Sequence, residues 1–121
     1  MKKKQNLLQS FGNAFRGMYI FFLNDRNGEI HLFAALMAIG LSVALGISAS
    51  EWLAVLLCTG IVIGFEMMNA AVEKLCDLVQ QEYHPIIKAV KDISAAAVLW
   101  TSIVSALTGC IIFIPKIIAL L

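Results

Sequence analysis

Charged residues are scarce in this sequence of 121 residues. Asp, Glu, Lys and Arg make up 14% of it and hydrophobic residues 60%, whereas a soluble domain has about 25% charged and 45–50% apolar residues. A chain this small leaves much of its surface exposed, so a core of its own is too small to bury so many apolar side chains. The composition therefore excludes a disordered chain and an ordinary soluble domain, and it predicts one membrane-embedded domain over residues 1–121.

Several common site motifs are also missing. The three cysteines, Cys58, Cys76 and Cys110, form no C-x-x-C motif, so neither a zinc site nor a disulfide framework is indicated. The sequence has no G-x-x-x-x-G-K-[ST] or G-x-G-x-x-G motif, which excludes the soluble nucleotide-binding folds built on those loops. A net charge of +1 offers no electrostatic basis for binding nucleic acid.

Long apolar runs are abundant instead. They predict membrane spans over about 30–48, 52–70 and 93–114, each near the roughly 20 helical residues that cross a bilayer. The second span is the first part of one predicted helix over about 51–80, whose polar second half leaves the membrane. Pro115 is predicted to end the third span, because proline disrupts helices.

The N-terminal segment over about 5–23 predicts an amphipathic helix. Its apolar residues recur at helical spacing, and polar residues such as Gln9 and Asn13 fall between them. Such a helix lies at a membrane surface, with the basic Lys2–Lys4 on anionic headgroups; a helix packed on the rest of the protein fits the same pattern. The predicted fold is an all-α membrane protein with an amphipathic surface helix and three transmembrane helices.

The basic residues predict an orientation in the membrane. Of the nine Lys and Arg residues, eight fall on one side of the predicted spans and only Lys116 falls on the other. Because cytoplasmic loops carry the excess of Lys and Arg, we expect a multi-pass protein of the bacterial cytoplasmic (inner) membrane. Its N-terminus is expected in the cytoplasm and its C-terminus on the far side.

The most informative feature is a polar stripe within the helix predicted over 51–80. At about 100° per residue, Glu66, Asn69, Glu73 and Asp77 fall within an arc of about 80°. A helix that leaves the membrane and turns a solvated face outward accounts for Asp77. It does not account for Glu66, which follows fourteen apolar residues, because an acid at membrane depth is costly and marks a functional site. Aligned oxygen ligands of like charge favour Mg²⁺.

Two more polar clusters lie on the same predicted side of the membrane. One is a predicted loop over 81–88 and the start of the last helix, and the other precedes the first span and includes His31. Acidic groups that prefer Mg²⁺, together with a lysine and a histidine, suit a nucleoside triphosphate site. The residues of the two clusters are Glu82, Tyr83, His84, Lys91 and Asp92, and Asp25, Arg26, Asn27 and His31.

Three segments resemble the signature of the small prokaryotic diacylglycerol kinase family, which includes undecaprenol kinases. They are E-M-M-N-A-A-V-E-K-L-C-D (66–77), E-Y-H (82–84) and K-D-I-S-A-A-A-V-L (91–99). The resemblance extends over essentially the whole chain. It implies a homotrimeric inner-membrane enzyme that transfers the γ-phosphate of MgATP to a lipid alcohol, with active-site residues contributed across subunits.

The resemblance also implies roles for individual residues. Glu66 resembles the catalytic carboxylate that activates the lipid hydroxyl, and Asp25 and Glu73 resemble the metal-binding acids. Asp25 stands where the family usually has Glu, so its carboxylate reaches less far. The predicted ATP-binding residues are Asp25, Glu73, Asp77, Glu82, Tyr83, His84, Lys91 and Asp92, and the predicted supporting residues of the active site are Asn69, Trp52 and Arg16.

Alternatives remain for the acceptor and for the class of protein. Diacylglycerol, converted to phosphatidic acid, is the first expected acceptor. Undecaprenol, converted to undecaprenyl phosphate, is the alternative, because the stretches at 26–31 and 51–52 look more like the undecaprenol kinase branch. A small transporter or interaction subunit, with Glu66 and His31 as an ion relay, explains the buried acid. It does not explain the polar clusters on the same side.

Overall fold

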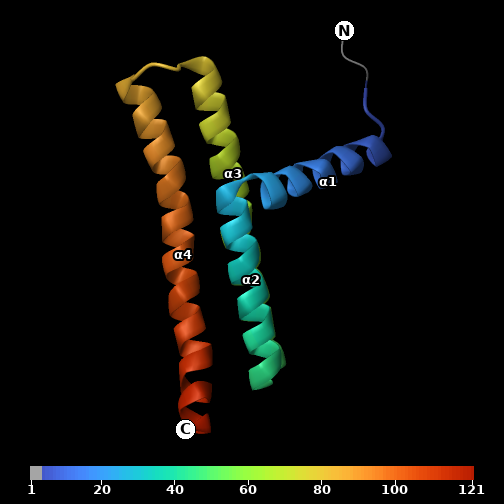
Figure 1. The fold of residues 1–121 in the computed structure, drawn as a ribbon, viewed down its shortest axis with the longest axis vertical. Coiled ribbons are helices and arrows are strands. Elements are labelled where there is room, and N and C mark those ends of the chain that lie inside the picture. The colour runs from blue at the N-terminus through green and yellow to red at the C-terminus, as the bar shows by residue number, and fades with distance from the viewer. Residues whose placement is uncertain (1–3) are drawn as a thin grey trace.

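The structure, a computed structural model that describes residues 4–121, contains four helices in this part of the chain. They are α1 (Leu7–Asn24), α2 (Arg26–Leu45), α3 (Ala49–Val79) and α4 (Pro85–Leu120). Helices α2, α3 and α4 run alongside one another, and α1 projects sideways from the start of α2 (Figure 1). The basic start at Lys2 and Lys3 lies outside the described residues.

Three of the helices have the length and the apolar composition predicted for the membrane spans. Helices α2, α3 and α4 are each long and apolar enough to cross a membrane. Helix α1 forms where a helix was predicted, but its amphipathic placement on a membrane surface stays a prediction. The predicted helix over 51–80 corresponds closely to α3.

The last helix is longer than predicted at both ends. It begins at Pro85, since His84 caps it by accepting a hydrogen bond from the Ile86 N–H, and proline suits the first helical turn, where its missing N–H costs nothing. The predicted polar loop over 81–88 is therefore wrong in its second half. Helix α4 also continues through Pro115 to Leu120, so Pro115 does not end it. An interior proline removes the hydrogen bond to the carbonyl four residues before it and crowds that carbonyl, which kinks a helix without always ending it.

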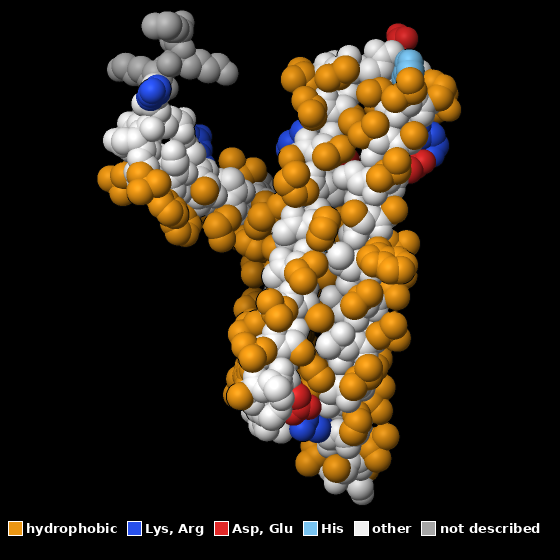
Figure 2. Space-filling view, turned by 180° about the vertical axis from the view of Figure 1, so that it is seen from behind, with side chains coloured by type: hydrophobic (Ala, Val, Ile, Leu, Met, Phe, Trp, Pro, Cys, Tyr) orange, Lys and Arg blue, Asp and Glu red, His pale blue; other side chains and the backbone are white. Residues whose placement is uncertain are grey.

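Most large apolar side chains point outward rather than into a core. Hydrophobic side chains cover the length of the bundle in Figure 2, and acidic and basic side chains lie toward its ends. A small buried cluster of Ile47, Val55 and Ile112 joins α3 and α4 at the end away from α1. Beside it, Lys116 Nζ lies 3.1 Å from Glu51 Oε1. An apolar exterior around so small a core is the surface that lipid requires.

The corner between α1 and α2 is closely packed. Phe21 is buried there, and a Cβ atom on Gly28 would lie 1.8 Å from the Phe21 carbonyl oxygen. Only glycine fits at this position. The close contact fixes the direction in which α1 leaves the bundle, and it holds the intervening Asp25 in place.

Candidate active site

The polar stripe of α3 runs from the interior of the bundle toward its tip. Glu66 and Asn69 are buried, with relative exposures of 4% and 5%, whereas Glu73 and Asp77 are exposed. At 1.5 Å per residue, Glu73 lies about 10 Å and Asp77 about 16 Å along the helix from Glu66. The stripe therefore connects a carboxylate inside an apolar bundle to carboxylates in a polar environment.

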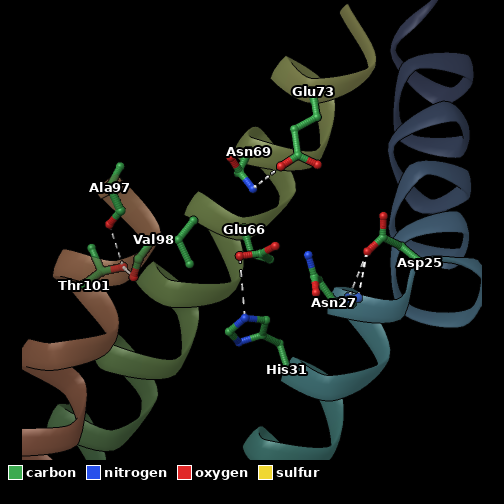
Figure 3. A network of polar contacts seen from close by, with 10 residues as sticks. Asp25, Asn27, His31, Glu66, Asn69, Glu73, Ala97, Val98 and Thr101 are labelled. Atoms are coloured by element: carbon green, nitrogen blue, oxygen red, sulfur yellow. Dashed lines mark hydrogen bonds and ion pairs between the residues drawn. The ribbon is translucent and has the colours of Figure 1, made fainter. Parts of the chain in front are cut away.

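Glu66 faces α2. His31 Nε2 lies 3.6 Å from Glu66 Oε2, and Figure 3 shows the two side chains directed toward each other across the gap between the helices. His31 was noted in a polar cluster of the sequence, and it was paired with Glu66 only in the alternative of a transporter; it was not among the predicted site residues of the kinase. Its spacing in the sequence does not reveal this contact, because the two residues lie on different helices.

Asn69 has one satisfied and one unsatisfied polar atom. Its Nδ2 donates a hydrogen bond of 3.3 Å to Glu73 Oε1. Its Oδ1 is buried and has no hydrogen-bond partner among residues 4–121. Buried acceptors in proteins are almost always paired, and an unpaired one calls for an explanation. A donor group on a bound ligand would satisfy this oxygen.

Asp25 caps α2 and contacts Lys74 on α3. Its Oδ1 accepts hydrogen bonds from the backbone N–H groups of Asn27 (3.0 Å) and Gly28 (3.2 Å), and Lys74 Nζ lies 3.8 Å from its Oδ2. The cap explains why an acid stands at this position, since a carboxylate is favoured at a helix N-terminus. Lys74 was used in the sequence only to assign the orientation, and its contact with Asp25 is a new element of the site.

The donors around Asp25 and Glu73 suit Mg²⁺ only in part. Both supply carboxylate oxygens, which Mg²⁺ prefers. Within the described part of the chain, no group of three or more His, Cys, Asp and Glu side chains is placed to hold a metal ion. Since Mg²⁺ is commonly bound by one or two carboxylates together with substrate phosphates and water, two acids fit a site that a bound nucleotide completes.

Two ion pairs engage predicted nucleotide residues at the tip, one between α3 and α4 and one within α4. Lys91 Nζ donates a 2.6 Å hydrogen bond to Asp77 Oδ1. This hydrogen bond raises the pKa of the Lys91 ammonium, because it favours the charged form. Asp92 pairs with Lys88, a residue absent from the predicted set, at 2.5 Å.

The remaining predicted residues are more scattered. His84 is the N-cap of α4, and Glu82 and Tyr83 are exposed in the short connection before it. Arg16 is exposed on α1. The structure does not bring Trp52 to the stripe, because Trp52 packs on the cluster at the opposite end of the bundle, about 21 Å along α3 from Glu66.

Two hollows are lined by residues that lie near the stripe in the sequence of α3. One, of about 190 Å³, lies among α2, α3 and α4 and has His31 in its wall. The other, of about 510 Å³, lies between α1 and α3, and its lining includes Met67, Ala70, Asp25 and Lys74. Each hollow is largely apolar and has charged or titratable side chains in its lining: His31 in the first, and Asp25 and Lys74 in the second.

Comparison with known proteins shows the family to which the chain belongs. Residues 12–113 match the family model described as prokaryotic diacylglycerol kinase. The chain belongs to this family. It is 33% identical over 109 residues to the undecaprenol kinase of Bacillus subtilis (strain 168), covering 90% of this chain and 89% of that protein.

Two further relatives are named diacylglycerol kinase. The protein from Synechocystis sp. is 33% identical over 117 residues, covering 96% of this chain and 67% of its own length. That from Escherichia coli (strain K12) is 26% identical over 106 residues, covering 88% and 87%. The protein is therefore a lipid kinase, either a diacylglycerol kinase or an undecaprenol kinase, and its three apolar helices make it a multi-pass membrane protein.

Proposed function

We propose that the protein transfers the γ-phosphate of MgATP to the hydroxyl of a membrane lipid, with Glu66 as the general base. One observation carries this proposal: Glu66 is 4% exposed in a bundle whose exterior is apolar. A lipid alcohol keeps its chains in the bilayer and presents its hydroxyl near that depth. A buried carboxylate within hydrogen-bonding reach of that hydroxyl accepts its proton as the oxygen attacks phosphorus.

The nucleotide is proposed to bind along the exposed part of the stripe. Asp25 and Glu73 would hold Mg²⁺, which neutralises charge on the triphosphate when it is bound. Lys91 would exchange its pairing with Asp77 for a phosphate oxygen, and a lysine ammonium is charged at neutral pH in either pairing. Asp77, Glu82, Tyr83, His84 and Asp92 would complete the nucleotide contacts. The alternative of a non-enzymatic transporter leaves this group of residues without a role.

Diacylglycerol is the first proposed acceptor. Undecaprenol is the alternative, because one of the relatives is named undecaprenol kinase and two others are named diacylglycerol kinase. Both acceptors are alcohols with long hydrocarbon chains, so the same base and the same nucleotide site serve either of them.

The proposed setting is the bacterial cytoplasmic membrane. The tip that carries Lys88 and Lys91 would face the cytoplasm with the N-terminus, and the C-terminus would lie on the far side. Helix α1 would lie at the cytoplasmic interface, with Arg16 near the headgroups. We also propose a homo-oligomer, a trimer by family resemblance, because three spans are too few to enclose a lipid and a nucleotide together.

A phosphate-transfer assay in mixed micelles tests the proposed function. Purified protein receives labelled ATP and Mg²⁺, with diacylglycerol and undecaprenol offered separately and then together. Labelled phosphatidic acid or labelled undecaprenyl phosphate identifies the acceptor. A folded protein that labels neither lipid, and whose behaviour is unchanged by Glu66→Gln, contradicts the proposal.

A further inference from the structure

The contact between His31 and Glu66 has no role in the mechanism proposed so far. The two side chains are 23% and 6% exposed, and Nε2 lies 3.6 Å from Oε2. Across residues 4–121, the structure shows no other hydrogen bond or ion pair to the Glu66 carboxylate. The last side-chain torsion of a glutamate has no narrow preferred angle. A buried carboxylate with a single polar neighbour therefore depends on that neighbour for its orientation.

Packing on both helices holds this pair in register. One turn deeper in the bundle, Ala35 on α2 and Val62 on α3 are also buried. They follow His31 and precede Glu66 by four residues, so each lies on the same helix face as its partner. At the other end of the pair, the Gly28–Phe21 contact and the Asp25 cap fix the start of α2. The packing of α2 against α3 and α1 therefore fixes the position of the His31 imidazole.

Among residues 4–121, the contact with Glu66 is the only hydrogen bond or ion pair of the His31 side chain. The hollow of about 190 Å³ beside it is lined mainly by small and apolar side chains, such as Ala34, Val62 and Phe113. An imidazole between an apolar space and a carboxylate directs its polar edge to the carboxylate. In Figure 3 the other oxygen of Glu66 points toward the side of the site where Asn27 and Asp25 lie.

We propose that His31 is a positioning residue for Glu66. Its Nε2–H holds Oε2, which leaves Oε1 free to take the proton of the lipid hydroxyl. At 3.6 Å the contact is longer than a hydrogen bond, and it shortens when the lipid and the nucleotide order the site, as catalytic hydrogen bonds commonly do. This inference rests on the proposed function, because it assigns His31 through the role of Glu66 as base.

The proton balance of the step keeps His31 out of the transfer itself. The lipid oxygen forms its bond to the γ-phosphorus while the bond from that phosphorus to the leaving oxygen of ADP breaks. The hydroxyl proton moves to Glu66 Oε1, and His31 keeps its own proton on Nε2 throughout. A side chain that supplies a neutral N–H at the position of Nε2 is therefore predicted to replace histidine.

Three substitutions of His31 test this prediction. Glutamine places an amide N–H close to the position of Nε2, asparagine is one methylene shorter, and leucine has no donor. We expect His31→Leu and His31→Asn to lower kcat on the order of 10- to 100-fold, the cost of a misplaced catalytic group, with the KM for ATP little changed. His31→Gln is expected to keep kcat within a few-fold of the wild type.

A double substitution separates positioning from simple packing. If His31 acts only through the carboxylate, His31→Leu causes no further loss in a Glu66→Gln background, because the effects of coupled residues do not add. Thr59→Val is the matched control, since Thr59 lines the same hollow and the change removes a polar group without a change of shape. We expect it to leave kcat unchanged.

The outcomes distinguish this inference from the proposed function. If Glu66→Gln is fully active, the proposed base fails, and the role of His31 fails with it. If Glu66→Gln is inactive while His31→Leu has the kcat of the wild type, only the inference about His31 is overturned. If His31→Leu does not fold, the Gln and Asn variants decide: equal activity in these two contradicts a requirement for a donor at the Nε2 position.

Discussion

The two ends of the three-helix bundle differ in how completely their polar groups are satisfied. At the end that carries the α2–α3 connection, Ser48 and Glu51 cap each other's backbone N–H groups, and Glu51 also pairs with Lys116. At the opposite end, Glu66 is buried with one distant partner and Asn69 Oδ1 has none among the described residues. Unsatisfied groups cost stability, and proteins tolerate that cost mainly where function requires it. The comparison therefore separates an end that holds the fold together from the end at which we propose that the chemistry takes place.

The largest effect is expected from Glu66→Gln. The amide keeps the shape of the side chain but does not accept a proton, so transfer to lipid should fall on the order of 10²- to 10⁴-fold. ATP affinity should change little, since the nucleotide residues lie farther along α3. Equilibrium ATP binding and phosphate transfer, measured on the same preparation, check both parts, and a loss of ATP binding equal to the loss of transfer would contradict the assignment.

Gly28→Ala should damage the active-site end by a different route. The added Cβ would meet the Phe21 carbonyl oxygen at 1.8 Å, so α1 and the Asp25 cap must shift, at a cost of about 1–3 kcal/mol or more. Reduced thermal stability and reduced transfer should appear together. Gly40→Ala on the same helix meets no atom within 4 Å and should be neutral or slightly stabilising. Equal behaviour of the two variants would exclude the close packing at this corner as the cause.

Glu73→Gln should raise the Mg²⁺ concentration needed for half-maximal transfer. The substitution removes one of the two proposed carboxylate ligands, and it also changes the acceptor of the Asn69 amide. A shift on the order of 10-fold is expected from the loss of one ligand or its support. A Mg²⁺ titration at saturating ATP measures it, and an unchanged titration curve would count against the ligand role.

The smallest effect belongs to the Glu51–Lys116 pair. Both side chains are about one-third exposed, and partly exposed pairs contribute about 0.2–1 kcal/mol. A double-mutant cycle with Glu51→Gln and Lys116→Met, followed by thermal unfolding, should yield a coupling free energy in that range. Transfer activity should stay near that of the wild type. A large loss of activity would mean that the two ends are not functionally separate.

The sequence predicted the helices better than the contacts between them. Periodicity and apolar length are local properties, so the helical stripe of Glu66, Asn69, Glu73 and Asp77 could be read directly. Pro115 misled the prediction because an interior proline kinks some helices and ends others, and residue type alone does not show which of the two occurs. Residue type alone did not show that His84 caps α4.

The missed parts of the site are the tertiary ones. The contacts from His31 to Glu66 and from Lys74 to Asp25 join residues 35 and 49 positions apart in the sequence, and no spacing rule for a single helix connects them. Trp52 shows the reverse case: it was predicted to support the active site, but α3 carries it to the far end of the bundle. Contacts across helices depend on rotation and register, which a single sequence does not reveal.

The most direct test of this account makes the same substitution at both ends of the bundle. Glu66→Gln and Glu51→Gln each replace one carboxylate by an amide on α3, and phosphate transfer from labelled ATP to lipid is measured for both in the same mixed micelles. The account predicts that Glu66→Gln loses transfer while Glu51→Gln keeps nearly all of it. Equal activity in the two variants, with both proteins folded, would contradict the claim that the buried carboxylate beside His31 is the catalytic base.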